Sequence, residues 1–337
     1  MRLFRRNPSG RAFAGPPTCL GSLIWNNQTM LAQAKPEPPA KAPSRPRRVV
    51  QRFPGRRHPR RGRRRGRPRD ANALHPSQAS PVRRDETAAM SSVREHYDNH
   101  LGPVYAWMVG GETSALARGD AEIGALDVAP RGGGIAVDLG AGFGMHAIAL
   151  AERGFDVVAV DACSVLLDRL ERLGQGRRIR IVRDDMQSFV DHLPGAPELV
   201  MCLGDTLTHL PDDSDVEALI EEIAGVMEPG GRFIATFRDY SQRLDGTRRF
   251  IPVRSDMDRN MTCFLEYSES HVLVHDILSE RRGAEWATRV GAYRKLRLAP
   301  ARFRSMLIAR GFSVEQSSEP AGMVRFSSRL DHPGNPE

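Results

Sequence analysis

The sequence predicts an α/β fold with a doubly wound, mostly parallel sheet and an antiparallel β insertion after the fifth strand. From residue 134, short apolar runs rich in β-branched residues alternate with amphipathic helical stretches, the pattern of a parallel sheet covered by helices on both faces. Between about residues 250 and 298, extended segments follow one another with no helical stretch between them, which is typical of antiparallel strands. The predicted fold class is therefore Rossmann-like with an appended β insertion.

Five parallel strands are expected, each a short apolar run bounded by turn residues. They are residues 134–139, 156–160, 178–182, 198–203 and 231–237. The helices between them are expected near residues 145–153, 164–173, 187–192 and 213–226. The Pro229-Gly230-Gly231 turn ends the last of these helices, because proline stops a helix and glycine accepts a positive φ.

The carboxyl-terminal third is expected to add antiparallel strands to the core sheet. Three extended segments cover residues 261–268, 271–280 and 286–298, and a helix near residues 300–310 precedes a closing pair of strands at 312–318 and 323–329. Residues 90–132 lie before the first strand, and we expect them to form a helical lid. The domain itself then spans residues 133–330, with the insertion at about 250–298.

Residues 1–89 differ sharply in composition from the rest of the chain. They contain 21 Lys and Arg against 4 Asp and Glu, whereas residues 90–337 contain 28 against 37, so the net charge of +8 divides into +17 and −9. The segment is rich in arginine and proline and has no apolar periodicity. Such a composition cannot bury enough apolar surface to offset chain entropy, so we predict that it is disordered.

Three interpretations of this extension stay open. The dense run Arg56–Arg69 can neutralise phosphates, which favours attachment to nucleic acid. Recurrent arginine and serine with no acid before Glu37 are typical of an organellar transit peptide. The chain has 46 Arg and 3 Lys, as GC-rich coding gives, and globular patterning begins at Met90, which favours a misplaced start. Nucleic acid is an expected partner only if the extension belongs to the native protein.

Other function classes are disfavoured by composition. No stretch approaches the roughly 18 to 20 consecutive apolar residues that cross a bilayer, so we expect a soluble, cytoplasmic protein with no membrane partner. The cysteines show neither CxxC nor Cys/His ligand spacing, so no metal site and no disulfide framework is expected; they are Cys19, Cys163, Cys202 and Cys263. No pattern predicts an oligomeric state.

A glycine-rich loop follows the first expected strand and precedes a helix. Gly140, Gly142 and Gly144 are spaced GxGxG. Asp138 stands two residues before the first glycine, and Asp161 ends the second expected strand. Glycines at this place let the backbone approach a ligand, and the second acid can accept both hydroxyls of a ribose. Dinucleotide fingerprints place the third glycine one residue later to seat a pyrophosphate, so this spacing disfavours a nicotinamide cofactor.

The segment DLGAGFG, with VDAC at the next strand end, resembles motif I and the following acidic position of class I S-adenosylmethionine-dependent methyltransferases. The resemblance implies S-adenosyl-L-methionine as cofactor, with the glycines and Asp138 at its amino-acid part, Asp161 at its ribose and Asp185-Met186 at its adenine. The implied cofactor set is Asp138, Gly140, Ala141, Gly142, Gly144, Asp161, Asp185, Met186 and Leu203. The pair Asp184-Asp185 has a second interpretation as a solvated turn or helix cap.

The stretch Cys202–Pro211 after the fourth expected strand lacks an Asn/Asp-Pro-Pro-Tyr motif, which argues against methylation of nucleobases or glutamine. It resembles the segment CLGNSFAHLPD of glycine and sarcosine N-methyltransferases, and the likeness spans most of residues 95–312. Further matching segments are Tyr97-Asp98, Trp107–Gly110, Phe237–Tyr240, Arg254–Asp256 and Arg294–Leu298. Pro252-Val253 stand where that group has tyrosines, which disfavours glycine itself as the acceptor.

The resemblance implies a small-molecule substrate, methylated on the nitrogen of an amine or amino acid. It implies that Arg238 binds an acceptor carboxylate bidentately, although pairing with a nearby acid is an alternative. Tyr97 and Trp107 of the lid are expected to contact the acceptor. Asp205 replaces an asparagine of that group, and its charge would stabilise the positive nitrogen that forms, unless it caps a helix or binds backbone instead.

Rival functions remain at this stage. An O-methyltransferase would need a base, for which His209 is the candidate in the site and His275 a second one, although either histidine is more often structural. A nucleic-acid-associated protein would rely on the arginine-rich extension. A cofactor-binding domain without catalytic activity also fits the sequence.

Overall fold

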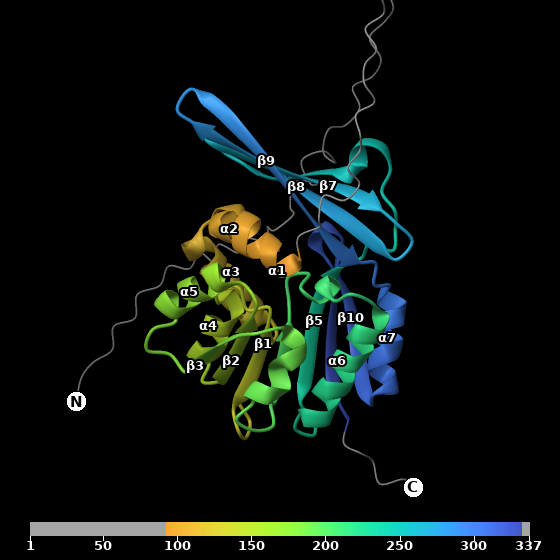
Figure 1. Cartoon of the computed structure of the whole chain (residues 1–337). Coiled ribbons are helices and arrows are strands. Elements are labelled where there is room, and N and C mark those ends of the chain that lie inside the picture. Colours follow the sequence, from red (N-terminus) through yellow and green to blue (C-terminus); the bar gives the residue numbers. More distant parts are fainter. Residues whose placement is uncertain (1–91, 332–337) are drawn as a thin grey trace, which may run out of the picture. The chain divides into compact units, whose positions relative to one another are not determined.

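The computed structural model describes residues 92–331 (Figure 1). The extension at residues 1–89, predicted to be disordered, lies outside the described residues, and so does the nucleic-acid interpretation that depends on it. The described strands form a seven-stranded sheet in the order β10-β11-β5-β4-β1-β2-β3 and a separate four-stranded sheet in the order β6-β7-β8-β9.

The large sheet confirms the predicted doubly wound α/β class. Its strands are β1 Ile135–Leu139, β2 Asp156–Asp161, β3 Ile179–Arg183, β4 Leu199–Cys202, β5 Arg232–Arg238, β10 Phe312–Glu319 and β11 Met323–Leu330. The first five pair in parallel, and β11 pairs antiparallel with both β5 and β10. Because β2 and β4 lie on opposite sides of β1, the chain reverses its winding direction there, and such a switch point is where open α/β sheets bind ligands.

Helices cover both faces of this sheet (Figure 1). They are α3 Glu112–Ala125, α4 Met145–Glu152, α5 Ser164–Leu173, α6 Asp213–Val226 and α7 Pro300–Ala309. Apolar residues of α6 and α7 pack with one set of inward side chains of the strands, whereas those of α3, α4 and α5 pack with the alternate set. This arrangement explains why the parallel strands read as nearly continuous apolar runs: they are buried on both sides.

The insertion forms its own sheet, so the expectation that it extends the core sheet was wrong. Its strands are β6 Phe250–Ser255, β7 Arg259–Tyr267, β8 His271–Arg282 and β9 Glu285–Leu296. The free edge of β5 is taken by β11, so no edge at β5 remains for these strands to join. Strand β6 was not predicted from the sequence, because Pro252 interrupts its alternation of apolar and polar residues. The pairing of β6 with β7 also shifts register after Pro252, and both features are typical of edge strands.

The amino-terminal segment before α3 bridges the two sheets. It consists of α1 Val93–His96, a π-helical turn Tyr97–Leu101 and α2 Gly102–Met108. A capping box starts it, since the Ser92 hydroxyl accepts from the Glu95 backbone N–H and the Glu95 carboxylate accepts from the Ser92 N–H. Leu101 and Val104 pack on the small sheet, and Val109 packs beside Phe143 of the large domain. None of the helices in residues 92–331 is long and apolar enough to cross a membrane.

Candidate functional site

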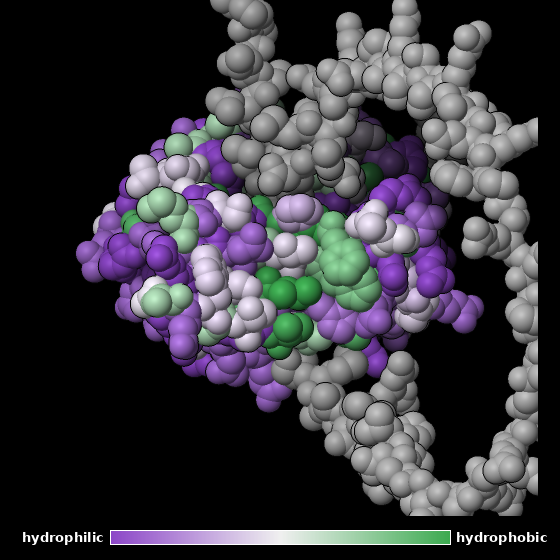
Figure 2. Space-filling model, turned by 90° about the horizontal axis from the view of Figure 1, so that it is seen from above, coloured by the Kyte–Doolittle hydropathy of each residue, from purple (hydrophilic) through white to green (hydrophobic). Residues whose placement is uncertain are grey.

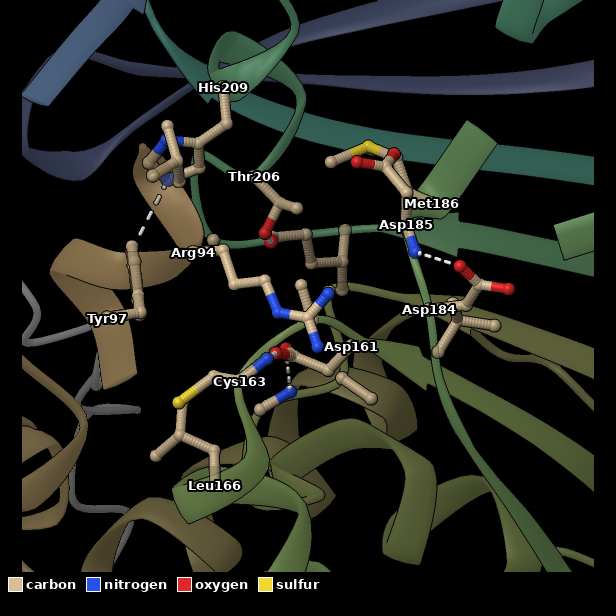
Figure 3. Close-up of a pocket in the computed structure, with 18 of the residues that line it drawn as sticks. Arg94, Tyr97, Asp161, Cys163, Leu166, Asp184, Asp185, Met186, Thr206 and His209 are labelled. Carbon is tan, nitrogen blue, oxygen red and sulfur yellow. Dashed lines mark hydrogen bonds between the residues drawn. The ribbon is translucent and has the colours of Figure 1, made fainter. Parts of the chain in front are cut away.

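A cavity of about 360 Å³ lies at the carboxyl ends of the parallel strands (Figure 3). The lining comes from the ends of β1 to β4 with the residues that follow them, and from the amino-terminal segment: residues 140–143, 145–146, 160–163, 166, 184–187, 203–204, 206, 209–211 and parts of 92–109. The size is within the range of ligand pockets, roughly 300 to 1,000 Å³. The cavity therefore occupies the switch-point position at which the glycine loop was predicted to bind a ligand.

The glycine loop lines this cavity through residues 140–143, including Ala141. Gly140, Gly142 and Gly144 all have positive φ, at 75°, 55° and 91°, where side chains with a Cβ are strained. A Cβ on Gly140 would lie 2.3 Å from Cγ2 of Thr206, so glycine is needed there for contact between two loops. Gly144 lies outside the lining and instead lets α4 pack against Leu170 of α5, where a Cβ would be 2.2 Å from its Cδ1.

Asp161 ends β2 and lines the cavity beside the loop (Figure 3). Its Oδ2 accepts a 2.7 Å hydrogen bond from the Gly142 N–H, and its Oδ1 accepts one of 2.8 Å from the Cys163 N–H. These bonds fix the carboxylate in place and leave lone pairs free for a ligand. Burial raises the pKa of Asp161, while the two backbone donors act in the opposite direction.

Asp138 lies in β1 directly behind the loop and is 1% exposed. Its Oδ2 has no hydrogen-bond partner among residues 92–331, which is rare for a buried carboxylate oxygen. Burial raises its pKa to about 6, although the neighbouring His146 opposes the shift. Asp138 is not among the residues that line the cavity, so a ligand donor would reach it through the loop.

Asp185, Met186 and Leu203 also line the cavity, as predicted for a set that surrounds one ligand. Asp185 caps the short 3-10 helix Met186–His192, because its Oδ1 accepts from the Gln187 N–H at 3.0 Å. Asp185 therefore caps this helix and also lines the cavity, so the two interpretations of this aspartate are compatible. Asp184, its neighbour, is held by His192 at 2.9 Å.

Tyr97 and His209 meet at the other end of the cavity (Figure 3). The Tyr97 hydroxyl lies 3.3 Å from Nε2 of His209, and the two rings are nearly perpendicular. Burial lowers the pKa of His209 well below its usual value, and the positive charge of Lys295 acts in the same direction. His209 is therefore neutral at physiological pH. The alternative base His275 lies on the small sheet, paired at 2.5 Å with Glu266, and does not line the cavity.

Asp205 is buried behind the cavity wall and is not part of its lining. Its Oδ2 accepts from Lys295 Nζ at 2.6 Å and from the Tyr240 hydroxyl at 3.0 Å. Its Oδ1 accepts from the Arg238 backbone N–H and from the Thr208 hydroxyl, both at 2.9 Å. The carboxylate thus anchors the loop that carries Thr206 and His209 and binds backbone, which is the alternative that the sequence left open beside a role at the acceptor nitrogen.

Two expected acceptor contacts lie elsewhere in the fold. The Arg238 guanidinium donates to the carbonyl of Ala321 in the turn between β10 and β11. The Trp107 indole N–H donates to Asp256 Oδ2 at 2.5 Å, at the edge of the small sheet. Neither residue is in the cavity lining, because β5 ends beneath the β10–β11 turn and α2 turns Trp107 outward toward β6 and β7.

Two cavity residues of the amino-terminal segment, Arg94 and Tyr105, were not predicted from the sequence. Arg94 extends into the cavity toward Asp161 (Figure 3), and Tyr105 packs edge-on against Phe143 of the glycine loop. The Ser92-x-x-Glu95 capping box signals the start of the helix that carries Arg94. No local signal marks Tyr105 as a cavity residue. Residues 92–331 hold no cluster of three or more His, Cys, Asp or Glu side chains suited to a metal ion.

Comparison with known proteins agrees with this geometry. Residues 136–231 match a family described as a methyltransferase domain. A glycine/sarcosine N-methyltransferase of Halorhodospira halochloris is 29% identical over 157 residues, which are 45% of this chain and 58% of that protein. The chain thus matches little more than half the length of that relative.

Two solved structures share the fold over most of the chain. The CcbJ methyltransferase of Streptomyces caelestis has a TM-score of 0.59 at 18% identity and covers 70% of this chain and 98% of its own. SAM-bound CalS10, an amino pentose methyltransferase of Micromonospora echinaspora, has a TM-score of 0.54 at 17% identity, with coverages of 68% and 95%. The described chain therefore has the fold of these structures, residues 136–231 resemble a methyltransferase domain, and the predicted resemblance to the glycine/sarcosine N-methyltransferase group is confirmed.

Proposed function

We propose that this protein is an S-adenosylmethionine-dependent methyltransferase that methylates the nitrogen of a small amine. One observation carries the proposal: a glycine loop with positive φ angles and the acid Asp161 share a cavity at the switch point of a sheet whose residues 136–231 match a methyltransferase domain. The two structural neighbours named above are methyltransferases, and one of them was solved with S-adenosylmethionine bound.

The residues around the cavity fit this cofactor. Asp161 has lone pairs to accept two ribose hydroxyls, and the unpartnered Oδ2 of Asp138 suits a positive ammonium donor behind the loop. Asp185 and Met186 flank the opposite wall, where an adenine amine could donate to the carboxylate. The GxGxG loop lacks the glycine spacing that seats a pyrophosphate, and S-adenosylmethionine has no phosphate. When bound, the cofactor supplies an electrophilic methyl group on its sulfonium.

The electrostatics at Tyr97 favour an acceptor that becomes positively charged. Burial raises the pKa of Tyr97 well above its usual value, and negative charges on Asp276, Asp161 and Asp205 raise it further. These three carboxylates contribute negative potential at the Tyr97 hydroxyl. A nitrogen that gains positive charge as it accepts a methyl group is stabilised there, without any proton transfer to the enzyme in that step.

An amine without a carboxylate fits this site better than an amino acid. The Arg238 guanidinium is engaged at the β10–β11 turn, so it would have to leave Ala321 to bind an acceptor carboxylate in the cavity. Arg94 is the arginine that lines the cavity in the described part of the chain, and it points toward Asp161 rather than toward His209 (Figure 3). Amino acids remain acceptors to be tested beside amines.

O-methylation is the second candidate, because the contact between the Tyr97 hydroxyl and His209 Nε2 places an imidazole in the cavity wall. The lowered pKa of His209 argues against it, since a weakly basic imidazole is a poor acceptor for the proton of an alcohol or phenol.

A methyl-transfer screen tests the proposed function. The full chain is incubated with S-adenosylmethionine and separate panels of amines, amino acids and phenols, and the demethylated cofactor is quantified. We expect turnover with amines and none with phenols. Turnover restricted to phenols would establish the second candidate, and absence of turnover in all panels despite cofactor binding would indicate a binding domain without catalysis.

A further inference from the structure

The small sheet has one buried face and one open face. Alternate side chains of β7 and β8, among them Met261, Cys263 and Val274, are buried against the amino-terminal segment. The intervening residues of β6 to β9 point the other way, and we call them the outer face. An antiparallel sheet with one solvated side normally carries polar residues there.

The outer face is apolar at its centre. Strand register places two rows of four residues across it: Phe250, Phe264, His275 and Ala292 in one row, and Pro252, Thr262, Ile277 and Val290 in the next. The Phe250 and Phe264 rings pack at 4.6 Å between centroids. Figure 2, which looks down on this sheet, shows hydrophobic residues gathered at the centre with hydrophilic residues around them.

Three large apolar side chains of the outer face are more than half exposed to solvent, although burial of apolar surface is favourable. Phe250 is 51% exposed, Trp286 is 52% exposed and Val290 is 60% exposed. Phe250 and Val290 belong to the two central rows, whereas Trp286 lies on the same face two rows beyond Val290, separated from it by the polar row Asn260, Ser279 and Thr288. A contiguous apolar patch with a polar rim marks an interaction site on a soluble protein.

The dimensions of the face match one half of a standard interface. Its strands contain 6, 9, 12 and 12 residues. At about 3.3 Å per residue and 4.8 Å between strands, the face covers roughly 600 Å² in projection, which is of the same order as the roughly 800 Å² that each partner buries in a standard interface.

We propose that the outer face binds the outer face of a second copy of this chain, so that two insertion sheets pack as a sandwich. A two-fold interface must be self-complementary, and a centre of mainly apolar side chains meets that condition, with His275 held there by Glu266 and Arg249 stacked on Phe264. Its rim carries both signs of charge, with Glu266 and Arg294 on either side of Leu273 in one cross-strand row.

A two-fold arrangement of this kind places one opposite-charge pair and one like-charge pair across the rim, since Arg281 on β8 then lies near Arg281 of the second copy. A two-fold axis parallel to the strands, between β7 and β8, keeps each row at the same height and lays β9 of one copy over β6 of the other. Arg294 of one copy then lies about one strand spacing, roughly 4.8 Å laterally, from Glu266 of the other. Sheets stacked in this way lie about 10 Å apart, a gap that side chains the size of Phe250 and Val290 fill from both sides.

Light scattering coupled to gel filtration tests this dimer on the full chain. We expect the wild-type protein at about 50 µM to have twice the 37.4 kDa mass of one chain. Val290→Glu would bury an unpaired carboxylate in the interface and should weaken dimerisation at least about 100-fold, giving a monomer with an unchanged melting temperature. Ile308→Glu is the matched control, because Ile308 on α7 is also 52% exposed but lies off this face.

A dimer that persists in Val290→Glu would overturn the proposal, because the copies would then meet elsewhere. A monomeric wild-type chain would also overturn it and leave the face to a different protein. Dissociation of both the Val290 and Ile308 variants would show a nonspecific effect of added charge and count equally against the proposal.

Discussion

Lys295 Nζ lies 2.6 Å from Asp205 Oδ2, and both side chains are buried. Lys295 is on β9 of the small sheet, whereas Asp205 belongs to the loop after β4, whose neighbours Thr206 and His209 line the cavity. Lys295 also donates to the Asp205 carbonyl at 2.8 Å. This ion pair therefore joins the insertion to the wall of the candidate active site.

Replacing Lys295 by methionine should destabilise the protein by about 3 to 5 kcal/mol, because Asp205 is then left as a buried carboxylate without its cation. The double variant Lys295→Met/Asp205→Asn should recover part of that loss. Urea denaturation of the wild type, both single variants and the double variant measures the coupling. Additive effects in this cycle would mean that the pair contributes nothing beyond its separate parts.

Gly140→Ala should abolish cofactor binding and strongly destabilise the fold, since its Cβ would overlap Thr206. Gly176→Ala is the matched control: its φ of 76° nearly equals the 75° of Gly140, but nothing lies within 4 Å of the added Cβ. The control should cost only the backbone penalty of about 1 to 2 kcal/mol. Similar melting temperatures for the two variants would show that loop contact at Gly140 is unimportant.

Asp138→Asn should change how stability depends on pH. Burial raises the Asp138 pKa to about 6, so the folded state holds a proton that the unfolded state, with a pKa near 3.8, has lost. Wild-type stability from this group therefore falls as pH rises from about 4 to 6, by up to about 3 kcal/mol. The variant lacks that loss, so its stability relative to wild type should rise over this interval, while its affinity for S-adenosylmethionine drops at least tenfold.

Urea denaturation at several pH values between 4 and 7 makes this comparison, with the exposed Asp168→Asn as control. If the difference in unfolding free energy between Asp138→Asn and wild type stays constant across that range, burial does not raise the pKa of Asp138.

His209→Gln should leave kcat for an amine acceptor within about tenfold of wild type. Burial lowers the His209 pKa well below 6.5, so the ring is already neutral and kcat should not titrate between pH 6 and 8. Glutamine keeps a hydrogen-bond acceptor for the Tyr97 hydroxyl. General-base catalysis is worth about 10² to 10⁴-fold, so a loss of that size in steady-state kinetics would instead identify His209 as a base.

The parallel strands, their helices and the glycine loop could be predicted because their signals are local. A strand such as β1 reads as an apolar run, and Gly140 and Gly142 stand within a few residues of the strand whose end they shape. Helix α5 begins and ends at the predicted residues, since its apolar face has a clear helical period.

The role of Asp205 could not be predicted in the same way. Its partners Tyr240 and Lys295 are 35 and 90 residues away in sequence, so no local pattern shows that its charge is neutralised. The position of Arg238 depends on the β10–β11 turn, which closes over β5 only in the folded chain. The separate insertion sheet likewise follows from competition for the edge of β5, which is a property of the whole topology.

Calorimetric titration with S-adenosylmethionine tests whether the cavity beside Asp161 binds this cofactor. We expect the wild-type chain to bind the cofactor in a one-to-one ratio. Asp161→Ala removes the carboxylate that Gly142 and Cys163 fix at the end of β2, so it should abolish the binding heat while the protein remains folded. Wild-type affinity in Asp161→Ala, or no binding by the wild type, would contradict the assignment of this cavity as the cofactor site.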